Sequence, residues 1–365
     1  ESQPEPLDVK PVFSLERDGI RFSAYDFDSQ LHVRLRLYIV RSQGSDKVQS
    51  LSLNVLDENL WPRFLAAMSV AFGKELADEN PGEPDPNTFG RIRKMISSDH
   101  SAIGFVAPRG IGQGAWNPDE SKQTQIRRRF MLLGQTVDGM RVWDVRRAIQ
   151  ALRSIDSQTE TPLTLQGQNT MAGAALYAAL FEPGVQTLHL WHPAHSHDEG
   201  PIFLNVLRYL DIPEAIAMAA ERTEVRVYRE DDFDWAFPKA VAKKLGWPEK
   251  QFQELVPQPA QDIFAAPDNP QVMRVGPDRK CKKPSEAARV AGDGAIVEID
   301  AGVYEGDVCV WGQNDLTIRG VGGYAHLKAE GASAQNKAIW VVKGRNATIE
   351  HIEFSGASVP DRNGA

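Results

Sequence analysis

Apolar and polar residues alternate one by one from Val12 to Val40, and again from Leu51 to Val55. A period of two is typical of antiparallel strands with one face in solvent. From Trp61 onward, helical periodicities take turns with compact apolar stretches, and strands that alternate with helices favour a mostly parallel sheet covered by helices on both faces. The pattern predicts these elements: a helix over 61–72, a strand over 102–107, a helix over 140–152, a strand over 185–191, helical material over 203–220, a strand over 225–228, and a helix over 238–245 closed by Gly246.

The segment from Thr161 to Phe181 predicts a buried strand over 162–166, a sharp turn at Gly167, and a helix from about Met171. A strand, a tight turn and a helix in an alternating α/β chain form the context of a nucleophile elbow, G-x-S-x-G. Gly167 fits the first position, whereas Asn169 stands where the serine belongs and Met171 where the second glycine belongs. Because a carboxamide cannot supply the attacking oxygen, the sequence predicts the scaffold of an acyl-transfer site without its nucleophile.

The last hundred residues follow another pattern. Residues 256–272 are proline-rich and lack periodicity, which predicts a linker between a domain over 10–255 and a domain over 273–365. Beyond the linker, Gly312-Gln-Asn314 and Gly344-Arg-Asn346 begin similar β stretches 32 residues apart, an imperfect repeat of β-solenoid type. Either the solenoid is cut short or its last coil is left open. The short β segments fall at 296–299, 308–310, 316–318, 339–342 and 349–354.

Composition narrows the functional classes. The chain has 365 residues, 42% hydrophobic and 25% charged, which fits a globular protein of two domains. A net charge of −8 argues against an electrostatic nucleic-acid binder, and no apolar run is long enough to cross a bilayer. Because the chain starts at Glu1, either a signal peptide has been removed or the chain is a fragment. The two cysteines, Cys281 and Cys309, form either one bridge or two buried free thiols.

The residues from Phe130 to Gly134 and from Asp138 to Leu152, followed by the Gly167 turn, resemble α/β-hydrolase esterases of the acetyl xylan esterase and cephalosporin-C deacetylase-like group. The resemblance covers roughly residues 10–250. It implies an α/β-hydrolase fold, and a serine, an acid and a histidine at the carboxyl edge of the sheet. By position these become Asn169 and either Asp231 or Asp232, and no histidine follows the last strand. The predicted function is therefore a degenerate acetyl-esterase-like hydrolase for carbohydrate esters.

The residues from Ala295 to Tyr304 and from Leu316 to Gly320 look like the opening coils of a right-handed parallel β-helix of the pectate-lyase-like kind. This resemblance implies a polysaccharide as partner. It also gives the alternative function, a polysaccharide-binding or lyase-like β-helix module beside a non-catalytic hydrolase domain. Oligomeric state and compartment stay open, although polysaccharide-linked relatives suggest export. The sequence assigns no cofactor and no metal.

Two further features lie near the predicted site, the hydroxyl of Thr170 and a histidine-rich loop. The hydroxyl of Thr170 either replaces the missing serine or helps to cap the helix that follows, and the one-residue shift favours the cap. His192, His195 and His197, followed by Asp198, come after the strand over 185–191. They could bind a divalent ion, or His195 could act as a base at the elbow, but Pro193 and the short spacing favour a polar loop.

Overall fold

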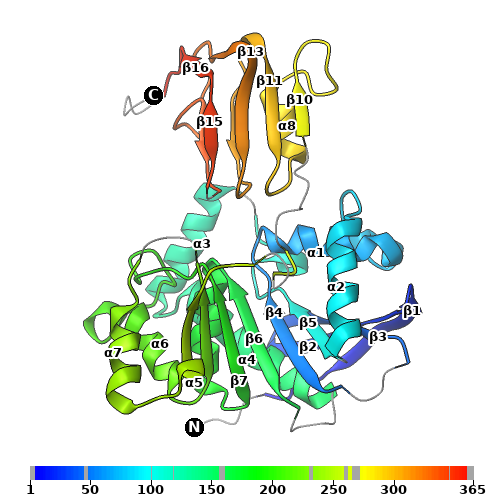
Figure 1. Cartoon of the computed structure of the whole chain (residues 1–365), viewed down its shortest axis with the longest axis vertical. Helices are drawn as coiled ribbons and strands as arrows, with labels where there is room; N and C mark the ends of the chain where they lie inside the picture. The colour runs from blue at the N-terminus through cyan, green and yellow to red at the C-terminus, as the bar shows by residue number, and fades with distance from the viewer. Residues whose placement is uncertain are drawn as a thin grey trace. The chain divides into compact units, whose positions relative to one another are not determined.

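The structure is a computed structural model, and it divides the chain into two compact units, Glu1–Phe264 and Ala265–Ala365 (Figure 1). Among the described residues no helix is both long and apolar enough to cross a bilayer. The described residues are 5–44, 48–99, 101–117, 119–155, 161–229, 233–258, 262–264, 272–344 and 346–359.

The first unit is a mixed α/β fold around one nine-stranded sheet, with the strand order β1-β2-β3-β5-β4-β6-β7-β8-β9. β1, β2 and β3 pair antiparallel, β3 is also antiparallel to β5, and all pairs from β5 to β9 are parallel. The period of two before residue 56 and the strand–helix alternation after it are both confirmed. The strands are β1 (Lys10–Arg17), β2 (Ile20–Gln30), β3 (Val33–Ser42), β4 (Ser50–Val55), β5 (Ser101–Val106), β6 (Leu163–Gln168), β7 (Val185–Trp191), β8 (Glu224–Tyr228) and β9 (Phe252–Leu255).

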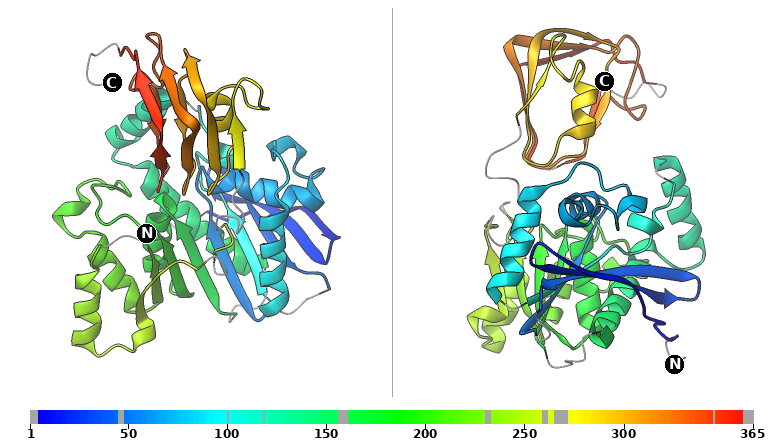
Figure 2. Two further views of the ribbon diagram at one scale, coloured as in Figure 1. Left: turned by 45° about the horizontal axis from the view of Figure 1, so that its top comes forward. Right: turned by 90° about the vertical axis from the view of Figure 1, so that its right-hand side faces the viewer.

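Helices cover both faces of this sheet, but not to the same extent (Figure 2). One face carries an apolar core that runs beneath α4, α5 and α6 from β2 to β8. The core of the other face lies between α1 and α2 and the strands β2, β3 and β5. The arrangement is consistent with an α/β-hydrolase fold. The helices are α1 (Leu60–Phe72), α2 (Pro86–Asp99), α3 (Glu120–Leu132), α4 (Val137–Ile155), α5 (Thr170–Phe181), α6 (Ile212–Ala220) and α7 (Ala236–Leu245), with 3-10 turns at Ala77–Glu79, Gly112–Gly114, Val206–Arg208 and Glu249–Gln251.

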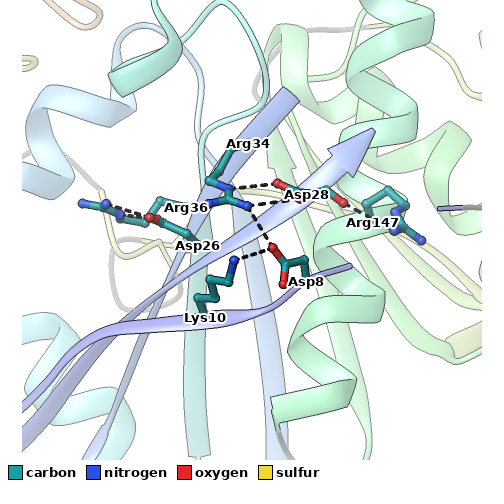
Figure 3. A network of polar contacts seen from close by, with 7 residues as sticks. All are labelled: Asp8, Lys10, Asp26, Asp28, Arg34, Arg36 and Arg147. Carbon is teal, nitrogen blue, oxygen red and sulfur yellow. Dashed lines mark hydrogen bonds and ion pairs between the residues drawn. The ribbon is translucent and has the colours of Figure 1, made fainter. Parts of the chain in front are cut away.

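Ion pairs connect β2 with β3, and a hydrogen bond connects β2 with α4. On the outside of β2 and β3, Arg34 binds Asp28 and Asp8, and Arg36 binds Asp26 (Figure 3). Arg147 of α4 donates to the carbonyl oxygen of Asp28 at 3.3 Å. Neighbouring opposite charges on paired strands add modestly to stability, so this network supports the register of β2 and β3.

A buried carboxylate lies between three segments of the first unit. Asp144 of α4 is 0% exposed and accepts hydrogen bonds from the Ser29 hydroxyl at 2.5 Å and from the backbone N–H of Arg109 at 2.9 Å. The guanidinium of Arg109 makes a two-point contact with the same carboxylate at 2.6 and 2.8 Å. Removing one partner of such a pair leaves an uncompensated buried charge, at a cost of about 3–5 kcal/mol. Asp144 therefore fixes the end of β2 and the loop after β5 against α4.

The second unit consists of parallel strands around a small apolar core. β10, β11, β13 and β15 form one sheet in that order, with β16 paired to β13, and β12 pairs with β14. Asn346 Nδ2 donates to Asp315 Oδ1 at 3.0 Å, and a Cβ on Gly344 would stand 1.7 Å from the Gln313 carbonyl oxygen. Successive turns are therefore stacked closely, although the sheet is not closed and a β-helix is not shown. The elements are β10 (Val272–Val275), α8 (Pro284–Val290), β11 (Ile296–Glu305), β12 (Cys309–Trp311), β13 (Thr317–Lys328), β14 (Trp340–Val342), β15 (Thr348–Glu350) and β16 (Ile352–Ser355).

The structure adds elements that the hydrophobic pattern did not predict, namely α2, α3 and β9 in the first unit and β10 and α8 in the second. It also continues the first unit past residue 255. Ile263 and Phe264 are each 3% exposed and pack in the core between α1, α2 and the sheet. The segment 262–264 therefore belongs to the first unit, although it lies within the predicted linker 256–272. The two cysteines are both free; Cys309 is buried and Cys281 is half-buried.

Candidate active site

The elbow predicted around Gly167 is present, but its turn lies two residues later. β6 continues to Gln168, α5 begins at Thr170, and Asn169 alone forms the turn, with φ 51° and ψ −120°. A residue other than glycine in such a sparsely populated region costs on the order of 1–3 kcal/mol and marks a candidate functional position. Gly167 is needed for a different reason: a Cβ there would stand 2.3 Å from the Met171 carbonyl oxygen. The glycine lets α5 approach β6 closely enough to form the turn.

Asn169 is held by its backbone and by its side chain. Its N–H donates to the Trp191 carbonyl oxygen on β7 at 2.9 Å, and its Nδ2 donates to Asp57 Oδ2 at 3.2 Å. The Oδ1 atom is buried without a hydrogen-bond partner in the described parts of the chain. The residue at the tip of the elbow is thus a carboxamide directed at a carboxylate.

Asp57 stands in the loop after β4 and is 3% exposed. Its Oδ1 accepts the backbone N–H groups of Leu60 at 2.7 Å and Asn59 at 3.0 Å, at the start of α1. Burial raises the pKa of this carboxyl group, and the three hydrogen bonds it accepts only partly oppose that shift. Asp57 was not singled out from the sequence, because nothing in the local pattern indicates a contact with Asn169 across 112 positions.

A second buried carboxylate comes from the segment after β9, where the resemblance implies a histidine. Gln168 Nε2 donates to Asp262 Oδ1 at 3.0 Å, and the same oxygen accepts the Phe264 N–H at 2.9 Å. Burial raises the pKa of Asp262 as well. Consecutive amides at the elbow, Gln168 and Asn169, thus each bind an acid from a different loop. Sequence reasoning missed Asp262 because it treated this segment as a linker.

The position of Asn169 in the sheet is one that suits a ligand. β4 and β6 are neighbours, yet the chain leaves β4 towards β5 and leaves β6 towards β7, in opposite directions along the sheet. In open α/β sheets, ligands bind outside the carboxyl ends of the strands at such a switch point. The loops that carry Asp57 and Asn169 flank this point.

The histidines after β7 have structural partners. The Nδ1 of His197 lies 2.6 Å from the Pro201 carbonyl oxygen and its Nε2 lies 2.7 Å from the Tyr177 hydroxyl, so both ring nitrogens are engaged. The ring of His195 stacks on Phe233, with centroids 4.1 Å apart and planes at 2°. Among the described residues no group of three histidine, cysteine or acidic side chains could hold a metal ion.

Thr170 is the first residue of α5 and is exposed; the cap position belongs to Asn169, and no side chain caps this helix. The capping role favoured for Thr170 is therefore wrong, because Asn169 occupies the cap position and no side-chain cap hydrogen bond forms at this end of α5. Asp231 and Asp232 lie outside the described residues, so the acid position stays a prediction.

No protein-family model and no curated protein matches the chain. Among solved structures, it is similar to a candidate acetyl xylan esterase of Bacteroides fragilis NCTC 9343, with 12% identity, a TM-score of 0.49, and 69% of this chain and 70% of the other covered. A glucuronoyl esterase of Solibacter usitatus has 13% identity and a TM-score of 0.47, with 67% and 76% covered. The acetyl xylan esterase of Paenibacillus sp. R4 has 15% identity and a TM-score of 0.42, with 68% and 82% covered. At these values the description of the fold rests on the topology of the chain itself.

Proposed function

We propose that the first unit is a degenerate hydrolase of the acetyl-esterase type, which binds carbohydrate esters without forming an acyl-enzyme. The observation that carries this proposal is the tip of the elbow, where Asn169 adopts the strained turn and its amide donates a hydrogen bond to Asp57. Nucleophilic acyl transfer needs a hydroxyl or thiol activated by a neighbouring base. The carboxamide of Asn169 supplies neither a hydroxyl nor a thiol.

The same geometry supports binding. Within the described residues, Asn169 Oδ1 is a buried acceptor without a partner. The N–H of Ala172 donates to the Asn169 carbonyl oxygen, whereas the N–H groups of Thr170 and Met171 before it have no acceptor inside the helix. An acceptor next to free donors at the carboxyl edge of the sheet matches an ester carbonyl flanked by sugar hydroxyls. The ester group is thereby held at the position where an esterase would attack it.

The proposal is tested on the full chain with p-nitrophenyl acetate and with acetylated xylohexaose. We expect no burst and no turnover above buffer, and slower hydrogen exchange over residues 56–61 and 167–172 when acetylated xylohexaose is added. Turnover that is lost in Thr170→Ala or Asp57→Asn, but kept in the exposed control Thr124→Ala, would establish a working esterase instead.

For the second unit we propose the opening coils of a right-handed parallel β-helix. Parallel pairing of β10, β11, β13 and β15 and the stacked turns at Gly344 and Asn346 support this architecture. A polysaccharide-binding role for this unit is the alternative function. It predicts that xylan or pectin slows hydrogen exchange in residues 296–355 of the full chain and leaves residues 163–228 unchanged.

A further inference from the structure

The middle of the strands β6 to β9 carries polar side chains on a face that no helix covers in the described parts of the chain. Strands of parallel sheets are normally buried on both faces. Here buried and half-buried residues alternate along β6, and largely along β7 and β8. The core beneath α1 and α2 contains residues of β2, β3 and β5, and none from β6 to β9 among the described residues. In Figure 1, α2 lies in front of β5, whereas no helix lies in front of β6 and β7.

The register places four planar hydrogen-bonding side chains in one row across this face. Gln166 pairs with His189, His189 with Arg226, and Arg226 with Gln253. In a parallel sheet, residues in register point to the same side, and adjacent strands are about 4.8 Å apart. We call Gln166, His189, Arg226 and Gln253 the polar row.

The two central side chains of the row are hydrogen-bonded to each other, and the two end amides are not hydrogen-bonded through their side chains within the described residues. Arg226 Nη1 lies 3.4 Å from His189 Nε2. Because a guanidinium can only donate, Nε2 accepts and the ring proton lies on Nδ1. Arg226 Nε is buried without a partner within the described residues. In the same part of the chain, the amides of Gln166 and Gln253 make no side-chain hydrogen bond.

The face carries little net charge. Burial, together with the nearby Arg226, lowers the pKa of His189 to about 4, so the imidazole is neutral at pH 7. Beside the row, Glu224 lies 2.6 Å from Lys250 Nζ and 3.8 Å from Arg226 Nη2. The carboxylate therefore offsets one of the two cations next to it, and Glu224, Arg226 and Lys250 together carry a single net positive charge.

We propose that the polar row, together with Thr164 and Thr187 of the row before it, binds an uncharged glycan chain laid across β6 to β9. Thr164 and Thr187 are in register and half-buried on the same face. The strand spacing is close to the length of one sugar ring in an extended chain, so successive strands meet successive rings. This surface is separate from the elbow at Asn169, and binding there does not depend on the function proposed for the elbow.

The chemistry of the face selects this ligand over others. A protein interface has a desolvated apolar centre, whereas the centre of this row is an imidazole and a guanidinium. A polyanion needs a cluster of cations, whereas Glu224 leaves these groups with a single net positive charge. Amides, a neutral imidazole and hydroxyls donate and accept at once, as sugar hydroxyls do.

The test titrates the full chain at pH 7 with xylohexaose, cellohexaose and mannohexaose, and with hexagalacturonate as the charged counterpart. We expect at least one neutral hexasaccharide to bind. The double variant Gln166→Ala/Gln253→Ala should bind it about thirtyfold more weakly, for two lost hydrogen bonds. The control Gln125→Ala removes an exposed amide from α3 and should leave the affinity unchanged.

Hydrogen exchange on the unmodified chain keeps the proposal testable if the double variant folds poorly. The neutral ligand should slow exchange in residues 163–168, 185–191 and 224–228. Three results would overturn the proposal: no saturable binding of any neutral hexasaccharide at millimolar concentration, tighter binding of hexagalacturonate, or protection confined to residues 56–61 and 167–172. Only the last of these would point to the elbow, so the failure of each proposal can be recognised separately.

Discussion

Replacing Asp57 tests whether the buried carboxylate holds the elbow and the start of α1 together. In Asp57→Ala, the N–H groups of Asn59 and Leu60 and the amide of Asn169 lose their acceptor. At 3% exposure water cannot replace it. An unsatisfied buried donor costs about 1–3 kcal/mol. Removing a costly buried charge offsets part of the sum, so we expect a net loss of about 3 kcal/mol in the free energy of unfolding.

The matched variant is Asp57→Asn, which keeps an oxygen for the two backbone donors. Its new amide faces Asn169, whose own amide can turn to present Oδ1. We expect this variant to lose less than about 1 kcal/mol, because each donor finds an acceptor again. The assay is hydrogen exchange of the full chain across a urea series, read on peptides from residues 56–72 and 163–181. Equal losses in the two variants would refute the reasoning, since an acceptor at this position would then not matter.

Three other changes have defined outcomes. Burial raises the pKa of Asp262, so the stability that this carboxyl group contributes is complete below its unfolded pKa of about 3.9 and is lost as the pH rises through its folded pKa. Between pH 4 and pH 7, the unfolding midpoint of Asp262→Asn should therefore rise relative to that of the unmodified chain. A difference between the two midpoints that stays constant with pH would contradict this. Gly167→Ala should abolish cooperative unfolding of the first unit or lower its free energy of unfolding by more than about 3 kcal/mol, because the new Cβ would stand 2.3 Å from a backbone oxygen. The control is Gly90→Ala in α2, where a Cβ has nothing within 4 Å, and it should raise the free energy of unfolding by about 0.5–1 kcal/mol. Both values are measured by urea titration. Iodoacetamide at pH 8 should modify Cys281 but not Cys309, because burial raises the pKa of the Cys309 thiol to about 12. Mass spectrometry of the peptides measures the modification, and a modified Cys309 beside an unmodified Cys281 would contradict this account.

The parts of the fold that could be predicted are those that local pattern determines. The alternation before Val40 defines half-exposed strands, and Gly246 ends α7 in the left-handed conformation, as its place after the last periodic residue indicates. The elbow was found because strand, glycine and helix lie within twenty residues of one another. Each of these signals is contained in a short window of sequence.

What could not be predicted depends on contacts between distant segments. α3 has few apolar residues and therefore no clear helical stripe. β9 has four residues and is defined by its pairing with β8. Asp262 meets Gln168 across 94 positions, and only the return of the chain after β9 reveals it. The partners of Asn169 were missed for the same reason: the sequence identified the residue at the tip, and the fold determined what surrounds it.

The carboxylate of Asp144 has a consequence for any attempt to redesign the first unit. One side chain on α4 receives bonds from Ser29 and from both the backbone and the guanidinium of Arg109. Asp144 is thus the common attachment point for the end of β2, the loop after β5 and α4. Grafting a different loop in place of residues 108–110 would loosen the distant hairpin too, unless the graft brings its own arginine to the same spot.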